Sequence, residues 1–348
     1  MYKAISYNPY DDNCQYVDVR SESEFQKGHI PGAINFPILS DEERHIVGHL
    51  YKNVSVDEAR KVGLEAGSKK LLPLFNLVEH LQAEMPQHKI VFYCSRGGYR
   101  STSVALLLRG IGLPVHWVSG GYKAYRQVVL NHLSAPDFYP KVIVLHGLSG
   151  TGKTHVLKTL QAKGLPVLDL ESIANHKGSH LGHIGIEAIQ TQQGFENQIF
   201  HELLRLNHKY CFAESESKRI GDVFMPQMLY DAIQTGEHII LEAELSFRVQ
   251  LLVSDYTHCE NFDTQLKDAI AKLSPYTSNV FLKELTELID VQNYALIAQR
   301  LLLEYYDPLY QKSIIKHEYS ETIQVSDINS ASSQIASWFI AKHPNATL

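Results

Sequence analysis

KVIVLHGLSGTGKTHVLKTL, residues 141–160, contains a glycine-rich turn between an apolar run and an amphipathic segment. The apolar run at 141–146 predicts a buried strand, and residues 153–160 predict a helix. The turn has the spacing G-x-x-x-x-G-K-T, and between such flanks its backbone N–H groups are predicted to bind phosphate. The sequence therefore predicts an α/β fold with a P-loop, in which a mainly parallel sheet carries helices on both faces.

Phosphate is expected to contact six residues of this turn, namely Gly147, Ser149, Gly150, Gly152, Lys153 and Thr154. The lysine supplies charge to the terminal phosphates, and the threonine hydroxyl is a candidate Mg²⁺ ligand. Asp169 and Glu242 each end an apolar run, where a second Mg²⁺ ligand would lie, although each could equally cap the next helix. Because the amides recognise phosphate oxygens, the motif alone does not distinguish ATP from another polyphosphate.

Further strands are predicted after the P-loop, at 165–170, 209–215, 238–244, 248–256 and 322–327. Residues 260–315 show three helical patterns, and 331–342 predict a last helix. The stretch 141–348 is therefore predicted to be a P-loop NTPase-like, doubly wound domain with C-terminal helices.

The N-terminal part, residues 1–134, alternates short strands with helices. A strand at 16–20 precedes a capping box formed by Ser21 and Glu24, and Ser55 with Glu58 opens a later helix in the same way. Two prolines and no periodicity mark residues 135–140 as a linker. The sequence therefore predicts a separate α/β domain ahead of the P-loop domain.

YCSRGGYRS, residues 93–101, places a cysteine at the end of the predicted strand KIVFYC and ahead of a helix. The glycine pair lets successive N–H groups point inward as an anion-binding nest, and the helix N-terminus and two arginines favour a thiolate. An inert buried cysteine is the alternative, but such cysteines seldom have these neighbours. The predicted catalytic loop comprises Cys94, Arg96 and Arg100, with Gly97, Gly98 and Ser101 as its nest.

Composition limits the function classes. A length of 348 residues with 44% hydrophobic residues favours two globular domains, and no apolar run is long enough for a membrane span. The four cysteines are widely spaced without a C-x-x-C pair, which argues against disulfides or a zinc cluster and for the reducing cytoplasm. A net charge of −6 means that any nucleic acid must bind a local basic patch.

Two polar stretches are weaker candidates. Residues 175–185 hold three histidines interrupted by glycines, which favours a polar loop near an anionic ligand over a metal site. Residues 214–222 are either a second anion site or a solvated charged turn. Candidate anion or RNA-phosphate contacts are Lys177, Ser217, Lys218, Arg219 and Arg248, each with surface solvation as the alternative.

Several motifs carry a family resemblance. VDVRSESEFQKGHIPGAINFP (17–37), CSRGGYRS (94–101) and SGGYKAYR (119–126) resemble the entry signature, active loop and closing motif of rhodanese domains. A rhodanese domain followed by a P-loop, DLESIANHKGSHLG (169–182) and ESESKRIG (214–221) is similar to the bacterial tRNA 2-selenouridine synthases. The resemblance extends over nearly the whole chain.

The resemblance implies a transferase that replaces sulfur by selenium in 2-thiouridine at the wobble position of tRNA. It implies selenophosphate as selenium donor, with a selenophosphate-supplying enzyme as a candidate partner, and S-geranyl-2-thiouridine, made from geranyl diphosphate, as intermediate. Cys94 matches the family's catalytic cysteine, which carries selenium as a perselenide. No tightly bound cofactor is implied beyond Mg²⁺ at the P-loop. The geranyl tail needs an apolar slot, for which the helices between 280 and 310 are the candidates.

One feature keeps other functions open. The spacing from Cys94 to Arg100 is Cys-x5-Arg, one residue longer than in simple sulfur-transferring rhodaneses and similar to rhodanese-fold phosphatases. The alternatives are a cysteine phosphatase or sulfurtransferase fused to an ATPase, or a rhodanese scaffold that only binds partners.

Overall fold

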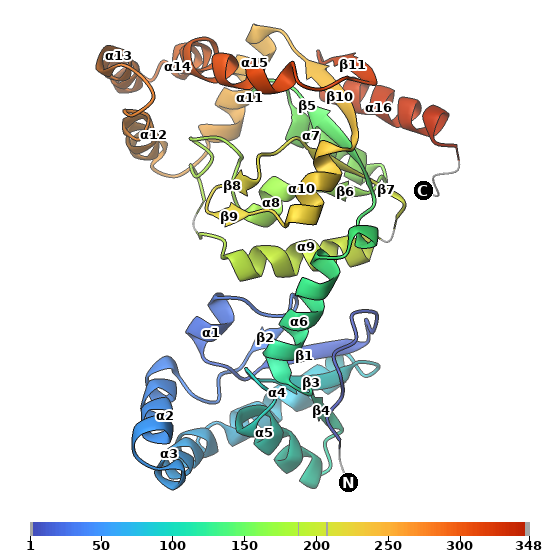
Figure 1. Cartoon of the computed structure of the whole chain (residues 1–348). Coiled ribbons are helices and arrows are strands. Elements are labelled where there is room, and N and C mark those ends of the chain that lie inside the picture. The colour runs from blue at the N-terminus through green and yellow to red at the C-terminus, as the bar shows by residue number, and fades with distance from the viewer. Residues whose placement is uncertain (1–2, 187, 207, 345–348) are drawn as a thin grey trace. The chain divides into compact units, whose positions relative to one another are not determined.

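The computed structural model describes residues 3–186, 188–206 and 208–344, which form two compact units (Figure 1). The first unit comprises the chain up to Leu133 together with Glu196–Leu204, and the second comprises Ser134–Phe195 and the chain from Arg205 onward. Helix α9 (Gln192–Leu206) therefore contributes its middle to the first unit. The connecting segment contains a short 3₁₀ helix, η1 (Pro136–Phe138).

The first unit is built on a four-stranded parallel sheet in the order β2-β1-β3-β4. Val17, Phe92 and Val115 of this sheet are fully buried and pack with Leu74 and Leu108 of the helices. The strands are β1 (Cys14–Asp18), β2 (Ile34–Asn35), β3 (Lys89–Tyr93) and β4 (Val115–Trp117). The helices are α1 (Glu22–Gln26), α2 (Asp41–Asn53), α3 (Val56–Ser68), α4 (Leu71–Glu84), α5 (Tyr99–Gly110) and α6 (Gly121–Leu133).

Both predicted helix starts are confirmed, although at Ser55 only the serine half of the predicted capping box is present. The capping box of Ser21 and Glu24 is present at α1. At α3 the hydroxyl of Ser55 accepts hydrogen bonds from the backbone N–H groups of Asp57 and Glu58. These local contacts satisfy amides that have no partner inside the helix.

The second unit is a doubly wound α/β fold around a five-stranded parallel sheet in the order β11-β10-β5-β7-β6 (Figure 1). Strand β5 is central, and the P-loop follows it at the carboxyl edge of the sheet. The strands are β5 (Lys141–His146), β6 (Val167–Leu168), β7 (Tyr210–Glu214), β10 (Glu237–Glu242) and β11 (Glu321–Gln324). Helices α7 (Lys153–Ala162), α8 (Leu170–Ala174), α10 (Gln227–Gln234) and α16 (Ile328–Lys342) accompany them, with the hairpin β8 (Arg219–Ile220) and β9 (Val223–Phe224).

The prediction of a strand at 248–256 is wrong, because this segment lies in helix α11 (Leu245–Tyr256). A short apolar run does not by itself separate a buried strand from a buried helix. The helix is stabilised by tertiary packing: Leu251 and Leu252 lie beside the glycines of the P-loop, and Arg248 is buried. The hydrophobic pattern of nine residues does not reveal these tertiary contacts, so it could not distinguish the helix from a strand.

The helical tail has more parts than the three predicted helices. It consists of α12 (Phe262–Ala271), α13 (Asn279–Asp290), α14 (Tyr294–Leu301), the π-helical turn η2 (Leu302–Tyr306) and α15 (Asp307–Ile314). Their apolar faces form a hydrophobic cluster that includes Leu266, Leu285, Ile297 and Leu301. Within the described residues, none of the helices has the length and apolarity needed to cross a membrane.

Candidate active sites

The catalytic loop of the first unit lies between β3 and α5. Cys94 follows the last residue of β3 and is 3% exposed, and Ser101 donates a hydrogen bond from its hydroxyl to the Cys94 sulfur at 3.2 Å. Helix α5 begins at Tyr99, so the unpaired amides of its first turn and its dipole are directed toward the loop. Arg96 is exposed and has no hydrogen-bond or ion-pair partner among the described residues. The loop thus combines a thiol, a hydroxyl donor and one available guanidinium.

The expected role of Arg100 at the thiol needs a correction. Its guanidinium donates to the Glu24 carboxylate at 2.6 Å and to the Ser95 hydroxyl at 2.8 Å. Burial alone would raise the pKa of Glu24, but hydrogen bonds from Arg100 and Ser95 and the charge of Arg44 lower it to about 2. The half-buried Glu24 carboxylate therefore binds the arginine that the Cys-x5-Arg spacing would assign to a phosphate. This pairing disfavours the phosphatase alternative.

A second glycine pair holds the back of this loop. The Cys94 carbonyl accepts a hydrogen bond from the Tyr122 amide at 2.8 Å. A Cβ added at Gly121 would lie 2.2 Å from the same carbonyl oxygen, and the backbone φ there is +58°. Only glycine permits this approach without displacing the loop. The closing motif at 119–126 therefore positions the cysteine.

The P-loop of the second unit has the expected strand–loop–helix form. Gly147, Gly150 and Gly152 all have positive φ, and a Cβ at Gly150 would lie 2.9 Å from the Arg248 carbonyl oxygen. Lys153 begins α7 and its ammonium donates to the Gly147 carbonyl at 3.0 Å. The loop is therefore curled around the lysine in the geometry that P-loops use for polyphosphate.

Three glutamates converge on the P-loop threonine. The Thr154 hydroxyl donates to Glu171 at 3.2 Å, and carboxylate oxygens of Glu171, Glu214 and Glu216 lie within 4.8 Å of one another. Burial is the main cause that raises the pKa of all three, to about 9 for Glu171 and about 8 for Glu216, and the charge of Glu214 adds to the increase at those two. The oxygen-only donor set is the type that a hard cation such as Mg²⁺ prefers.

The predicted Mg²⁺ partners Asp169 and Glu242 are not among these ligands. Asp169 caps α8 by accepting a hydrogen bond from the Ser172 amide at 2.9 Å, and Glu242 accepts one from Gln324 at 2.5 Å. The carboxylates beside Thr154 are instead those of Glu171, on the helix that Asp169 caps, and Glu214, at the end of β7. In the sequence, Glu214 is visible as a carboxylate at the end of an apolar strand. Only the strand order shows that this strand lies next to β5 and so brings Glu214 to the P-loop.

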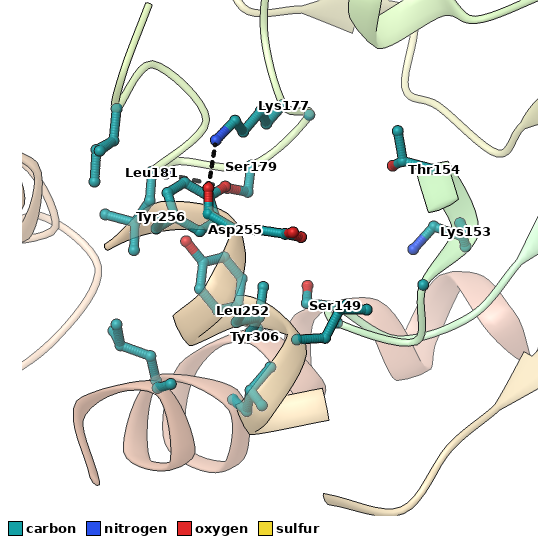
Figure 2. Close-up of a pocket in the computed structure, with 18 of the residues that line it drawn as sticks. Ser149, Lys153, Thr154, Lys177, Ser179, Leu181, Leu252, Asp255, Tyr256 and Tyr306 are labelled. Carbon is teal, nitrogen blue, oxygen red and sulfur yellow. Dashed lines mark hydrogen bonds between the residues drawn. The ribbon is translucent and has the colours of Figure 1, made fainter. Parts of the chain in front are cut away.

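A cavity of about 400 Å³ extends from the P-loop into the helical tail. Figure 2 shows Ser149, Lys153 and Thr154 on one side and Leu181, Leu252, Tyr256 and Tyr306 on the other. The far end is apolar and is lined by Ile184, Phe262, Leu266, Ile297 and Leu301. The cavity therefore joins the P-loop to a chamber lined mainly by apolar side chains.

The five candidate anion contacts separate in the structure. Lys177 lines the cavity with its ammonium 4.0 Å from the centre of the Tyr256 ring, whereas Ser217, Lys218 and Arg219 are exposed at the β8–β9 hairpin. The prediction that Arg248 contacts RNA phosphate is wrong. Arg248 is 4% exposed, and its guanidinium donates to Asp307 at 2.6 and 3.0 Å and to the Ser149 carbonyl at 2.8 Å. A buried, fully paired arginine is not available to tRNA, because exposing it would break the ion pair.

The fold and these sites define a P-loop protein joined to a rhodanese-like unit. The family model of the tRNA 2-selenouridine synthase AAA domain matches residues 140–343, and that of the rhodanese-like domain matches residues 6–128. The chain belongs to the tRNA 2-selenouridine synthase family, whose members are enzymes of tRNA selenouridine modification.

Curated relatives agree with this assignment. The chain is 34% identical over 247 residues to a tRNA 2-selenouridine synthase of Nitrosomonas europaea, covering 69% of this chain and 63% of that protein. It is 31% identical over 334 residues to that of Shewanella sp. (strain MR-7), covering 86% of this chain and 88% of the relative. It is 32% identical over 326 residues to that of Cupriavidus necator, covering 84% and 86%.

Proposed function

We propose that this chain attaches a geranyl group to the sulfur of wobble 2-thiouridine in tRNA and then exchanges that sulfur for selenium from selenophosphate. The observation that carries the proposal is the cavity that connects the P-loop to an apolar chamber. A diphosphate with a hydrocarbon tail matches both ends of this cavity. A nucleotide would place its polar sugar against leucine, isoleucine and phenylalanine side chains, where unpaired polar groups are costly.

The P-loop is the proposed diphosphate site. Its backbone amides and Lys153 would bind the phosphate oxygens and stabilise the negative charge of diphosphate as it leaves. Thr154, Glu171 and Glu214 fit Mg²⁺, since one oxygen of buried Glu214 has no hydrogen-bond partner within the described chain. Mg²⁺ held there would neutralise diphosphate charge.

The apolar chamber is the proposed geranyl site. Burying each methylene group there is worth about 0.8 kcal/mol, so the tail contributes strongly to binding and excludes water from the reacting carbon. The uridine sulfur then attacks the first carbon of the geranyl group, a C–S bond forms, and the C–O bond to diphosphate breaks. The product carries a sulfur that leaves as a neutral thiol when selenium attacks the pyrimidine carbon.

The first unit is the proposed selenium-transfer site. Cys94 lies beside the Ser101 hydroxyl and the start of α5, which supply hydrogen-bond donors next to the proposed nucleophilic sulfur. Exposed Arg96 is the candidate for the phosphate of selenophosphate. Two separate anion sites therefore serve two successive steps.

Mass spectrometry of tRNA nucleosides tests this division. Purified protein, 2-thiouridine tRNA and geranyl diphosphate should give S-geranyl-2-thiouridine, and added selenophosphate should give 2-selenouridine. Cys94→Ala should lose only the selenium step, whereas Lys153→Ala should lose both because geranylation comes first. Cys14→Ala, a half-buried cysteine of the same unit, and Lys163→Ala, at the end of α7, are the matched controls and should retain both steps.

Three results would contradict the proposal. Loss of geranylation in folded Cys94→Ala protein would remove the division of labour. Unchanged geranyl transfer by Lys153→Ala would remove the role of the P-loop. Release of phosphate from an aryl phosphate without any change in tRNA would favour the cysteine phosphatase.

A further inference from the structure

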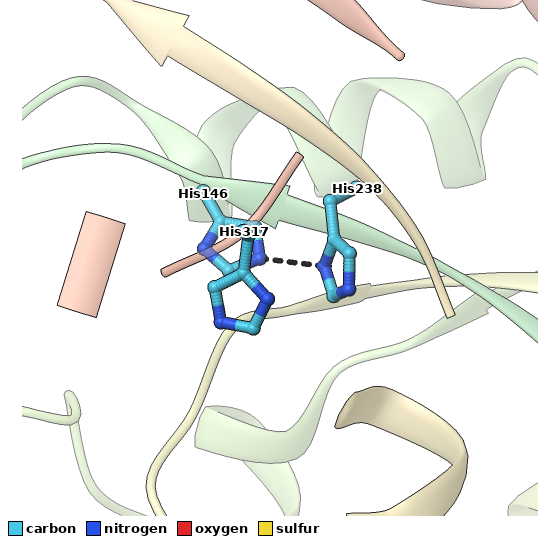
Figure 3. A group of neighbouring side chains, drawn as sticks. All are labelled: His146, His238 and His317. Atoms are coloured by element: carbon cyan, nitrogen blue, oxygen red, sulfur yellow. Dashed lines mark hydrogen bonds between the residues drawn. The ribbon is translucent and has the colours of Figure 1, made fainter. Parts of the chain in front are cut away.

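Three histidines outside the P-loop cavity converge on one face of the second sheet (Figure 3). His146 is the last residue of β5, His238 is the second residue of β10, and His317 lies between α15 and β11. The register pairs Ile240 with His146, so His238 and His146 are on the same face of neighbouring strands. One ring nitrogen of each histidine lies within 4.8 Å of the others, and the ring centres are 4.3–4.9 Å apart.

The hydrogen bonds of His238 direct a lone pair into this cluster. Its Nε2 lies 3.4 Å from the Gln234 carbonyl oxygen, which accepts only, so Nε2 carries the proton and Nδ1 is the free base. That Nδ1 accepts a hydrogen bond from Nε2 of His146 at 2.8 Å, and a bound ion would take the place of this proton between the two nitrogens. A backbone carbonyl that holds the far nitrogen of an imidazole is the usual support of a metal-binding histidine.

Burial favours the neutral imidazole at His146 and His238. Burial and the neighbouring histidines lower the pKa of His146 to about 3, and burial lowers that of His238. His317 is half-buried, and its ring has no hydrogen-bond partner among the described residues. Neutral imidazole is the protonation state that binds metals.

We propose that His146, His238 and His317 bind one divalent transition-metal ion, with Zn²⁺ the best match. Three imidazole nitrogens with a fourth position open to water form a common zinc site, whereas Mg²⁺ and Ca²⁺ prefer oxygen ligands. A Zn–N bond is about 2.0–2.1 Å, so nitrogens on one tetrahedral ion lie about 3.3 Å apart. The His146 and His238 nitrogens, 2.8 Å apart, would separate slightly, and the His317 ring would adjust toward the ion. The ion joins the ends of two strands to the segment before β11 and lies directly before Gly147 of the P-loop.

Metal binding by the full-length protein tests the site. Chelator-treated protein is titrated with Zn²⁺ by calorimetry and with Co²⁺ by visible absorption, and thermal unfolding is followed with and without Zn²⁺. We expect one ion per chain, a tetrahedral Co²⁺ spectrum, and an increase in melting temperature with Zn²⁺ but not with Mg²⁺.

His317→Ala is the main variant, because its half-buried ring lies outside the strands and its removal preserves the sheet. Loss of a support residue costs a metal site about 10–100-fold in affinity, so loss of a ligand should cost at least about 100-fold. His238→Ala should do the same. The control is His183→Ala, a half-buried histidine in the 175–185 segment, which should bind as the unaltered chain does.

Two results would overturn the proposal. The first is that His317→Ala keeps the Zn²⁺ affinity and the Co²⁺ spectrum of the unaltered chain. The other is loss of binding in His183→Ala with retention in His317→Ala, which would place the metal in the histidine-rich loop. Neither result depends on the tRNA reaction, so the metal site and the proposed function can fail separately.

Discussion

Glu24→Gln isolates the charge that holds the catalytic loop. Glutamine can still form a capping box at α1, so the substitution removes the ion pairs to Arg100 and Arg44 while the helix start is retained. Lowering the pKa of Glu24 from 4.5 to about 2 corresponds to about 3 kcal/mol at about 1.36 kcal/mol per pKa unit. Arg44 is 49% exposed, and allowing for solvent screening leaves about 1–2 kcal/mol.

The pH dependence has a definite sign. Because the folded-state pKa is lowered, this stabilisation is present above about pH 4.5 and is lost as the pH falls through about 2. The difference in free energy of unfolding between Glu24→Gln and the unaltered chain should therefore be largest at neutral pH. By about pH 3 it should have fallen by more than half.

Tryptophan fluorescence can report on the first unit alone. The sequence has two tryptophans, and Trp117 lies in β4 whereas Trp338 lies in α16. Urea unfolding in a Trp338→Phe background then follows Trp117. Glu22→Gln, an exposed acid of the same helix, is the control and should change the free energy of unfolding by less than about 0.5 kcal/mol. Equal stability of Glu24→Gln and the unaltered chain at neutral pH, or a difference that does not shrink in acid, would refute the reasoning.

Three other tests concern the backbone, the acidic cluster and the buried arginine. Gly121→Ala should abolish 2-selenouridine formation and destabilise the first unit, because the new methyl group overlaps a carbonyl of the catalytic loop. The control is Gly112→Ala, which also has a positive φ but no atom within 4 Å of the added Cβ. It should lower the free energy of unfolding by only about 1 kcal/mol and keep activity. Burial raises the pKa of Glu216 to about 8, so its contribution to stability is present below about pH 4.5 and is lost as the pH rises through about 8. The melting temperature of Glu216→Gln should therefore depend less on pH over this range. A melting temperature with the same pH dependence as the unaltered chain would contradict the raised pKa. Arg248→Ala should lower the free energy of unfolding of the second unit by about 3–5 kcal/mol, while the salt dependence of tRNA binding by the folded variant stays the same. A smaller salt dependence in the variant would instead indicate that Arg248 contacts an RNA phosphate.

Local signals in the sequence determined both strand–loop–helix sites of this protein. The P-loop and the cysteine loop depend on glycines, caps and apolar runs within about ten residues of one another, so their form follows from short-range sterics and hydrogen bonding. The helix starts at Glu22 and Val56 were predictable for the same reason, because a capping side chain bonds to amides of the next turn.

Tertiary structure alone decided which partner each charged side chain has. Arg100 pairs with Glu24, 76 residues away, and Arg248 pairs with Asp307, 59 residues away, so neither is available for the contact that its local sequence suggested. The fold also selected Glu171 over Asp169 as the neighbour of Thr154. The cavity and the histidine cluster likewise combine segments distant in sequence, and strand order and helix packing bring them together. The physical reason is that burial makes an unpaired charge costly, so each buried group takes the partner that the folded chain brings within reach.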